Sequence, residues 1–387
     1  MSASKIASVV GIPQETATGE RRVSMVPDTL SRLKDVSVLV QHGAGESAGF
    51  ADSAYIEKGA CIAPDAASLY GQSDIVLKVQ GPSPREAELL KEGSALISAL
   101  FPVSNLETVS RLAARRATVF AMELMPRISR AQSMDVLSSQ ATVSGYKAVM
   151  IAADSLPKLF PMLMTAAGTI SPARVLVMGA GVAGLQAIAT ARRLGALVEA
   201  YDVRPVVKEQ VMSLGAKFVE LPLEVKDAQT SGGYAKAQSE EFYRRQQELL
   251  TERIRASDVV ITTAQVPGQK APLLVAEEAV RGMRPGSVIV DLAAEQGGNC
   301  GATEPGKSVV KYGVTIHGPI NVPSMMAAQA SQLYSKNIAS FLSVVMKDGL
   351  LNIDLKDEIV RGTLVVNKGE ILHEPTKNAL LGMVMKK

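Results

Sequence analysis

The stretch VLVMGAGVAGLQAIATARRLGALVEAYD, Val175 to Asp202, decides the fold. It begins with a short apolar run typical of a buried parallel strand, and glycines in G-x-G-x-x-G spacing follow at once. A helical pattern then continues to Gly195, which is placed to end the helix in a left-handed conformation. A second apolar run stops at Asp202. This order of strand, glycine turn, helix and strand predicts a dinucleotide-binding unit.

Each glycine of the motif has a physical role. Gly179 permits the tight turn, Gly181 leaves room for a pyrophosphate beside the backbone, and Gly184 lets the helix pack closely on the strand. The first turn of the helix presents unpaired N–H groups to the phosphates. A glycine turn with a purely structural role is the alternative. The complete unit favours nucleotide binding, with Ala180 and Val182 among the contacts.

The acid at the end of the second strand predicts which nucleotide binds. A carboxylate at Asp202 would hydrogen-bond the 2′- and 3′-hydroxyls of the adenosine ribose, and it would repel the 2′-phosphate of NADP. We therefore expect NAD(H), with the flanking Tyr201 and Val203 in the site. Arg204 weakens this prediction, because an arginine can accommodate a 2′-phosphate.

Length and composition limit the remaining possibilities. A chain of 387 residues favours two domains, and a 47% hydrophobic content indicates packed cores. The net charge of +3 comes without a basic tract interleaved with aromatics, so we expect no nucleic-acid partner. No signal sequence or apolar run of membrane-spanning length is evident. Two distant cysteines without a metal-ligand pattern fit a reducing compartment. These features predict a soluble, cytoplasmic protein without a metal site.

Strand and helix patterns alternate twice along the chain, first up to about Leu124 and again from about Ser144 to Pro319. We therefore expect an α/β protein of two Rossmann-like lobes with mostly parallel sheets, joined by two long helices, with a cleft between the lobes for the nicotinamide. The methionines of FPMLMTAAG, near Pro161, have core spacing and are expected to pack between the lobes. The expected bounds are residues 1–126 with 325–387 for a discontinuous domain, 145–318 for the NAD(H)-binding domain, and 127–144 and 319–345 for the bridging helices.

Four segments carry a family resemblance, namely AMELMPRISRAQSMDVLSSQATVSGYKAV, MTAAGTISPARVLVMGAGVAGLQAIATARRLGA, VDLAAEQGGN and NVPS. They resemble the NAD(H)-binding domain of proton-translocating NAD(P) transhydrogenases, and more specifically the form in which this domain is a separate soluble alpha subunit. The match covers about Lys5 to Asn367, and RAQSMD is far more restrictive than a glycine fingerprint. Alanine dehydrogenases share the fold family and are the main competing interpretation.

The resemblance implies a nicotinamide pocket on the RISRAQSMD string. Arg127 and Ser138 would bind the carboxamide region, Asp135 would orient Arg127, and Gln132 would face the second nucleotide. On a helix these residues would share one face, since Gln132, Asp135 and Ser138 are three apart. The alternative is an amphipathic helix with a solvated charged face.

Two loops are expected to complete the nucleotide site. Thr263, Ala264 and Gln265 follow a strand of the second lobe and would cross the adenosine side of the cleft. The segment TSGGYAKA resembles the family's loop that closes over bound nucleotide, with Tyr234 as its contact. A plain surface loop with an exposed tyrosine is the alternative for this segment.

Proton chemistry separates the two candidate activities. The resemblance to alanine dehydrogenases requires a histidine after the strand that ends near Ala99, and an aspartate before QGG. This chain has LFPVSN there, without histidine, and Glu295 before QGG. Arg22 and Lys78 sit where that family holds its keto-acid carboxylate, and we expect them to support structure here. Direct hydride transfer between two nucleotides requires no such base.

The resemblance therefore implies a Re/Si-specific, proton-translocating NAD(P)+ transhydrogenase that is competent only with its partners. NADP(H) would be held on a beta subunit, and membrane-spanning subunits would translocate protons. The chain itself would form a homodimer, cytoplasmic and peripherally associated with the inner (plasma) membrane through its partners. An NAD-dependent alanine dehydrogenase and a non-catalytic NAD(H)-binding module are the alternatives.

Overall fold

The computed structural model describes residues 8–222, 239–265 and 270–384. The chain divides into two compact units: the first is Met1–Gln140 with Ser324–Lys387, and the second is Ala141–Pro323. Among the described helices, none is long and apolar enough to cross a membrane.

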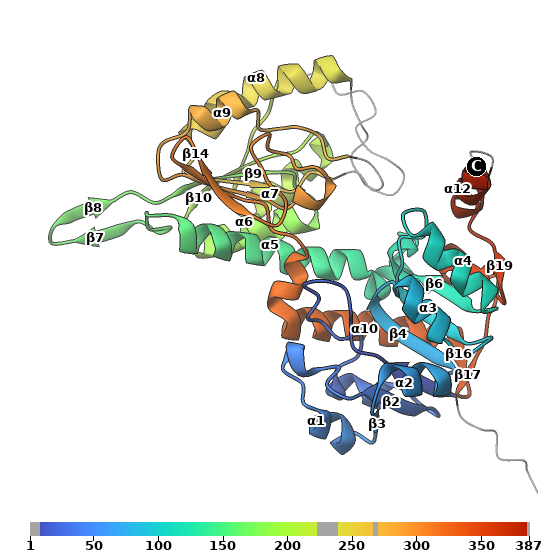
Figure 1. Ribbon diagram of the computed structural model, residues 1–387. Coiled ribbons are helices and arrows are strands. Elements are labelled where there is room, and N and C mark those ends of the chain that lie inside the picture. Colours follow the sequence, from blue (N-terminus) through green and yellow to red (C-terminus); the bar gives the residue numbers. More distant parts are fainter. Residues whose placement is uncertain (1–7, 223–238, 266–269, 385–387) are drawn as a thin grey trace, which may run out of the picture. The chain divides into compact units, whose positions relative to one another are not determined.

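An eight-stranded sheet forms the first unit, in the order β19-β18-β6-β5-β4-β1-β2-β3 (Figure 1). The six strands from β1 to β6 run parallel, whereas β18 pairs antiparallel with both β6 and β19. The C-terminal strands thus extend the sheet that the N-terminal strands begin. The strands are β1 (Val9–Ile12), β2 (Ser37–Gln41), β3 (Cys61–Ala63), β4 (Ile75–Gln80), β5 (Ala95–Ala99), β6 (Thr118–Ala121), β18 (Leu364–Asn367) and β19 (Glu370–Ile371).

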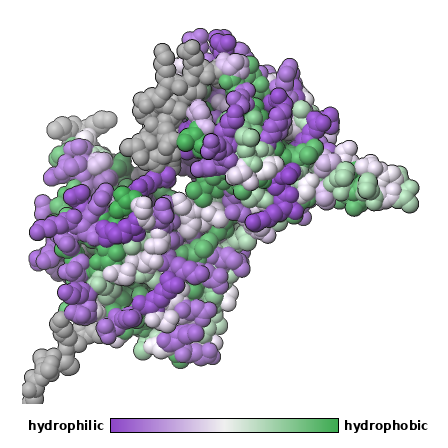
Figure 2. Space-filling model, turned by 180° about the vertical axis from the view of Figure 1, so that it is seen from behind, coloured by the Kyte–Doolittle hydropathy of each residue, from purple (hydrophilic) through white to green (hydrophobic). Residues whose placement is uncertain are grey.

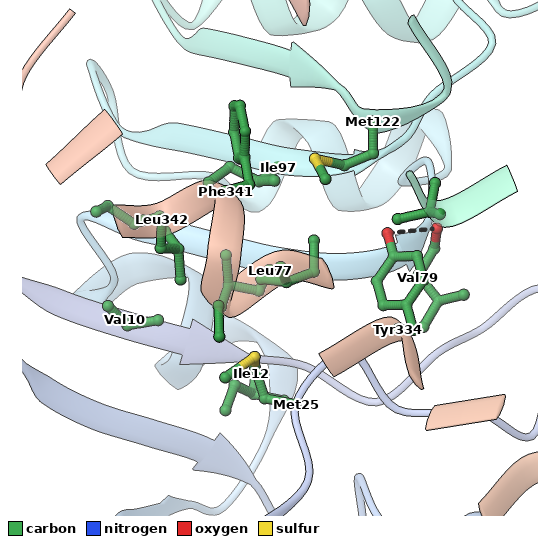
Figure 3. Packing of buried hydrophobic residues seen from close by; sticks show 14 of the residues in the cluster. Val10, Ile12, Met25, Leu77, Val79, Ile97, Met122, Tyr334, Phe341 and Leu342 are labelled. Atoms are coloured by element: carbon green, nitrogen blue, oxygen red, sulfur yellow. Dashed lines mark hydrogen bonds between the residues drawn. The ribbon is translucent and has the colours of Figure 1, made fainter. Parts of the chain in front are cut away.

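Helices cover both faces of this sheet. On one face lies α10 (Ala327–Val345), whose Tyr334 and Phe341 pack with Leu77 and Val79 of β4 (Figure 3). On the other face, α2, α3 and α4 pack over a second core that contains Val76. Successive β4 side chains therefore alternate between the two cores, as a strand requires. The remaining elements of the first unit are α1 (Asp52–Glu57), α2 (Ala66–Gln72), α3 (Pro84–Leu89), α4 (Leu106–Ala114), β16 (Met346–Lys347), β17 (Leu350–Leu351), α11 (Glu358–Thr363) and α12 (Glu374–Val384).

A seven-stranded sheet forms the second unit, in the order β11-β10-β9-β12-β13-β15-β14. All neighbouring strands are parallel except β14, which pairs antiparallel with β15. Because β10 and β12 both pair with β9, the strand order reverses at β9, which makes its carboxyl end the topological switch point. The strands are β9 (Arg174–Met178), β10 (Leu197–Tyr201), β11 (Lys217–Phe218), β12 (Val259–Thr262), β13 (Val288–Asp291), β14 (Ser308–Lys311) and β15 (Val314–His317).

Helices also cover both faces of the second sheet. The core on one face takes residues from α5 (Val136–Ser155), α6 (Val182–Arg193) and α7 (Lys208–Ser213). The core on the other face takes residues from α8 (Glu240–Ala256) and α9 (Glu277–Arg281). Both units therefore have the predicted α/β class with mostly parallel sheets, which is confirmed.

The helix predicted from residue 127 to 144 is interrupted. A 3-10 helix spans Ser129–Met134, Asp135 leaves the helical conformation, and α5 begins at Val136. The reason is a helix cap, because the Asp135 carboxylate accepts hydrogen bonds from Ser138 N at 2.9 Å and Ser138 Oγ at 2.6 Å. The expectation that Gln132 and Asp135 share one continuous helical face is therefore wrong.

The helix predicted over residues 319–345 also starts later than expected. Asn321 has a left-handed backbone with φ of +45°, a 3-10 helix follows over Val322–Met326, and α10 begins at Ala327. A right-handed helix cannot continue through a left-handed residue. The regular helix therefore lies in the first unit, where its apolar residues are buried in the core under β4.

The methionines near Pro161 do not belong to a core. They lie on a hairpin formed by β7 (Leu163–Thr165) and β8 (Gly168–Ile170), which pair as a separate two-stranded sheet. Met162 is 57% exposed and Met164 is 75% exposed. The prediction that they are core residues is wrong, because strands that pair only with each other leave both of their faces uncovered.

Candidate nucleotide-binding site

The glycine turn connects β9 to α6 at the switch point of the second sheet. Gly179 has φ of +103°, which favours glycine, and a Cβ at Gly184 would lie 1.8 Å from the Gly179 carbonyl oxygen. The helix thus approaches the turn as closely as two backbones can. Gly181 is the N-cap of α6, and the nearest atom to a Cβ built there is Arg204 Nη2 at 4.0 Å. The N-terminus of α6 therefore has space beside it for an anionic group.

Asp202 lies directly after β10, beside the glycine turn. Its Oδ2 accepts hydrogen bonds from Ala180 N and Arg204 Nη2, both at 2.7 Å. Its Oδ1 accepts from Arg204 N at 2.8 Å and from Arg204 Nε at 2.9 Å. Asp202 thus ties the turn after β9 to the backbone after β10. The bonds to Asp202 also raise the pKa of Arg204, so this guanidinium is fully charged.

The loop after β12 is fastened to the same turn. Thr263 N donates to the Met178 carbonyl at 2.8 Å, and Thr263 Oγ1 donates to the Gly179 carbonyl at 3.0 Å. Gln265 Nε2 donates to the Leu292 carbonyl at 2.8 Å. The structure thereby brings Gly179, Asp202 and Thr263 to one edge of the sheet. Tyr234, its segment from residue 230 to 237, and residues 266–268 of this loop lie outside the described residues.

Two buried residues that support this loop were not predicted as part of the site. Asn299 binds both polar backbone atoms of Ala264, accepting from its N–H at 3.0 Å and donating to its carbonyl at 2.9 Å. Asp291, at the end of β13, is fully buried and accepts five hydrogen bonds. Its donors are Thr262 Oγ1, Ala293 N, Asn299 N, Cys300 N and Thr303 Oγ1, at 2.8–3.0 Å. The available signal was an acid at the end of an apolar strand, next to the strand of the nucleotide loop.

The second predicted group lies in the first unit. Arg127 and Gln132 are exposed, while Asp135 and Ser138 are half-buried and bonded to each other. The structure thus brings two of the four residues together, and the expected orientation of Arg127 by Asp135 stays a prediction. The 3-10 helix between them is anchored by neighbouring elements. Asn337 Nδ2 of α10 donates to the Ser133 carbonyl at 2.8 Å, and Arg130 forms two bonds of 2.8 and 2.9 Å with Asp357.

Arg22 and Lys78 are both buried and paired with glutamates. Arg22 donates to Glu20 from Nε at 2.8 Å and from Nη2 at 2.6 Å. Lys78 Nζ lies 3.0 Å from Glu86 Oε1 and 3.2 Å from Glu15 Oε2, and its side chain is 1% exposed. Burial raises the pKa of Glu15 despite the nearby ammonium. Both cations have the internal partners that a structural role requires.

The Arg22–Glu20 pair should make folding of the first unit sensitive to acid. Burial disfavours the charged carboxylate, but the bonds from Arg22 outweigh it and lower the pKa of Glu20 from 4.5 to about 2. The pair therefore stabilises the folded state above pH 4.5, and this contribution is lost as the pH falls from 4.5 toward 2. We expect Glu20→Gln to cost about 3 kcal/mol near pH 6 and progressively less below about pH 4.5. Urea unfolding across this range measures it, and a cost independent of pH would contradict the assignment.

Comparison with known proteins identifies the family. The model of the alanine dehydrogenase/PNT N-terminal domain matches residues 11–144, and that of the C-terminal domain matches residues 148–374. The chain belongs to the alanine dehydrogenase/PNT family. Within this family, an NAD(P) transhydrogenase alpha subunit of Rhodospirillum rubrum, the first portion of a subunit that is divided there, is 51% identical over 374 residues. These residues cover 94% of this chain and 97% of that protein, at the same 51% identity.

Two further relatives place the chain within the alanine dehydrogenase/PNT family. The crystal structure of transhydrogenase from Sinorhizobium meliloti has a TM-score of 0.84 at 44% identity, covering 94% of this chain and 100% of that one. An alanine dehydrogenase of Halomonas elongata is 28% identical over 380 residues, or 96% of both chains. Similarity is thus much higher to the transhydrogenase relatives, and the resemblance inferred from the RAQSMD string is confirmed.

Proposed function

We propose that this chain is the NAD(H)-binding alpha subunit of a Re/Si-specific, proton-translocating NAD(P)+ transhydrogenase. The observation that carries the proposal is Asp202 beside the glycine turn at the switch point, in a chain 51% identical to a transhydrogenase subunit. Ligands of doubly wound sheets bind at this position, outside the carboxyl ends of the strands.

The residues present fit NAD(H). The turn from Gly179 to Val182 offers backbone N–H groups and an open N-cap for the pyrophosphate. Tyr201 to Arg204 would hold the adenosine ribose, and Thr263 to Gln265 would line the adenosine side. When bound, NADH supplies the hydride. In the first unit, Arg127 and Ser138 would hold the carboxamide, Asp135 would position them, and Gln132 would face the second nucleotide.

The end of β5 favours a transhydrogenase over an alanine dehydrogenase. There the N–H groups of Leu100 and Phe101 donate to the Glu123 carboxylate, and the described residues place no imidazole there to exchange a proton with a substrate. Each histidine of the chain is engaged at another position, His42 with Asp52, His317 with Ser155 and Ser308, and His373 with Thr376. Reduction of an imine needs a proton donor, whereas hydride exchange between nicotinamides does not.

The proposal assigns the remaining chemistry to partners. NADP(H) would bind on a beta subunit, and membrane-spanning subunits would translocate protons. The chain would then lie on the cytoplasmic side, peripherally associated with the inner (plasma) membrane. A non-catalytic NAD(H)-binding module is the alternative from another class, and binding without turnover in the presence of all partners would favour it.

The exposed hairpin supports a homodimer. The arm formed by β7 and β8 is largely apolar on its surface (Figure 2), and it displays Met162, Leu163, Met164 and Ile170. A second copy of the chain would remove these side chains from water. We expect Met164→Glu to shift the dimer to monomer in analytical ultracentrifugation, while Met212→Glu, at a methionine on α7 that is 56% exposed, leaves it intact. A dimer that tolerates both changes equally would exclude the hairpin as the interface.

Equilibrium titration of the isolated chain with NADH and NADPH tests the nucleotide assignment. We expect NADH to bind and NADPH to bind at least roughly tenfold more weakly, the effect of one charge-assisted hydrogen bond. Equal affinity for the two nucleotides, or reduction of NAD+ by the chain with alanine alone, would contradict the proposal.

A further inference from the structure

We infer that Arg204 is a displaceable internal ligand of Asp202 and that it sets how strongly the site discriminates NAD(H) from NADP(H). The inference rests on the proposed nucleotide function. It goes further by assigning a specificity role to a residue that the motif alone leaves ambiguous.

The Asp202 carboxylate is already saturated. A carboxylate has about four acceptor positions, and each oxygen of Asp202 accepts two hydrogen bonds, from donors at 2.7–2.9 Å. Two of the four donors belong to the guanidinium of Arg204. The Asp202 side chain is only 5% exposed, and that of Arg204 is 13% exposed. A ribose diol therefore cannot bind this carboxylate until some of these bonds are released.

The guanidinium bonds are the ones that can be exchanged. The donors Ala180 N and Arg204 N belong to the backbone of the glycine turn and of the segment after β10, so they are fixed by the fold. The Nε and Nη2 donors belong to a flexible side chain. Two ribose hydroxyls could replace them bond for bond, leaving the backbone bonds in place.

The displaced guanidinium stays near the phosphates. Arg204 Nη2 lies 4.0 Å from the position of a Cβ on Gly181, the glycine expected to face the pyrophosphate. A 2′-phosphate at the ribose would meet this cation as well as the Asp202 anion. Since Asp202 and Arg204 together carry no net charge, the repulsion of NADP(H) expected from Asp202 alone is largely cancelled. Discrimination then depends on which partner Arg204 takes.

Matched variants test this role through the ratio of the dissociation constants for NADPH and NADH. Arg204→Met should raise the ratio roughly tenfold, because Asp202 is then uncovered for the ribose and uncompensated toward a 2′-phosphate. Asp202→Asn should lower the ratio, because it frees Arg204 for the phosphate. Arg204→Lys keeps the charge without the planar fork and should stay near wild type. Lys208→Met removes a nearby exposed cation paired with Glu220 and should leave the ratio unchanged.

The outcomes separate this inference from the proposed function. If wild type does not bind NADH, the proposed function fails. If wild type binds NADH but Arg204→Met weakens both nucleotides by the same factor, Arg204 contributes only general affinity and the inference is overturned. A ratio that changes equally in Arg204→Met and Lys208→Met would also overturn it, since long-range charge would then explain the effect.

Discussion

Replacing Gly184 by alanine is expected to destabilise the second unit by about 3 kcal/mol and to abolish NADH binding. A Cβ at this position would lie 1.8 Å from the carbonyl oxygen and 2.8 Å from the carbonyl carbon of Gly179. These are backbone atoms, so the clash cannot be relieved by a rotamer change. The turn itself must move, and the N-terminus of α6 moves with it.

A second helical glycine provides the control. Gly71 lies in α2, and a Cβ there would meet nothing within 4 Å. Gly71→Ala should therefore stabilise the first unit by about 0.5–1 kcal/mol through helix propensity and leave NADH binding unchanged. Urea unfolding and NADH titration measure both variants. A Gly184→Ala protein that unfolds and binds like wild type would show that α6 does not pack on the turn as described.

Replacing Lys78 by methionine is expected to cost about 3–5 kcal/mol of stability. The substitution preserves much of the side-chain volume but leaves Glu15 and Glu86 without their shared ammonium in a buried site. An unpaired buried charge is expensive, whereas an intact buried pair contributes little net stability. Most of the expected loss therefore comes from the carboxylates that remain.

This origin predicts a partial rescue. Glu15→Gln in the Lys78→Met background should recover part of the loss, because it removes one of the uncompensated carboxylates. Lys91→Met breaks an exposed pair with Asp74 of 2.7 Å and should cost less than about 1 kcal/mol. Chemical denaturation of wild type and these variants measures the differences. If Glu15→Gln deepened the loss instead, the hydrogen bonds of Glu15 rather than its charge would dominate.

The nucleotide unit could be predicted from sequence because its determinants are local. Strand β9, the turn, helix α6 and strand β10 follow one another without interruption, and each glycine is required by backbone geometry at its own position. The family string then carried the activity, which no glycine motif specifies. The supports of the site depend on distant partners instead. Asp291 and Asn299 hold the loop after β12 through bonds that no spacing rule reveals.

The errors also have physical causes. Asp135 reads as a polar residue within a helical pattern, yet its side chain caps α5 and so ends the preceding turn. The hairpin methionines read as core, because alternating apolar residues have the same pattern whether a strand is covered by its own chain or by another molecule. Met164 at 75% exposure illustrates the second case.

Direct hydride transfer is the central claim, and isotope transfer tests it most directly. NADH deuterated at the transferred position of C4 is mixed with this chain, NADP+ and the NADP(H)-binding and membrane subunits, and the NADPH formed is analysed by mass spectrometry. We expect deuterium in NADPH, at full content in ordinary water, and no transfer when either the chain or the NADP(H)-binding subunit is omitted. NADPH that forms without deuterium, or no NADPH formation with all subunits present, would contradict the account.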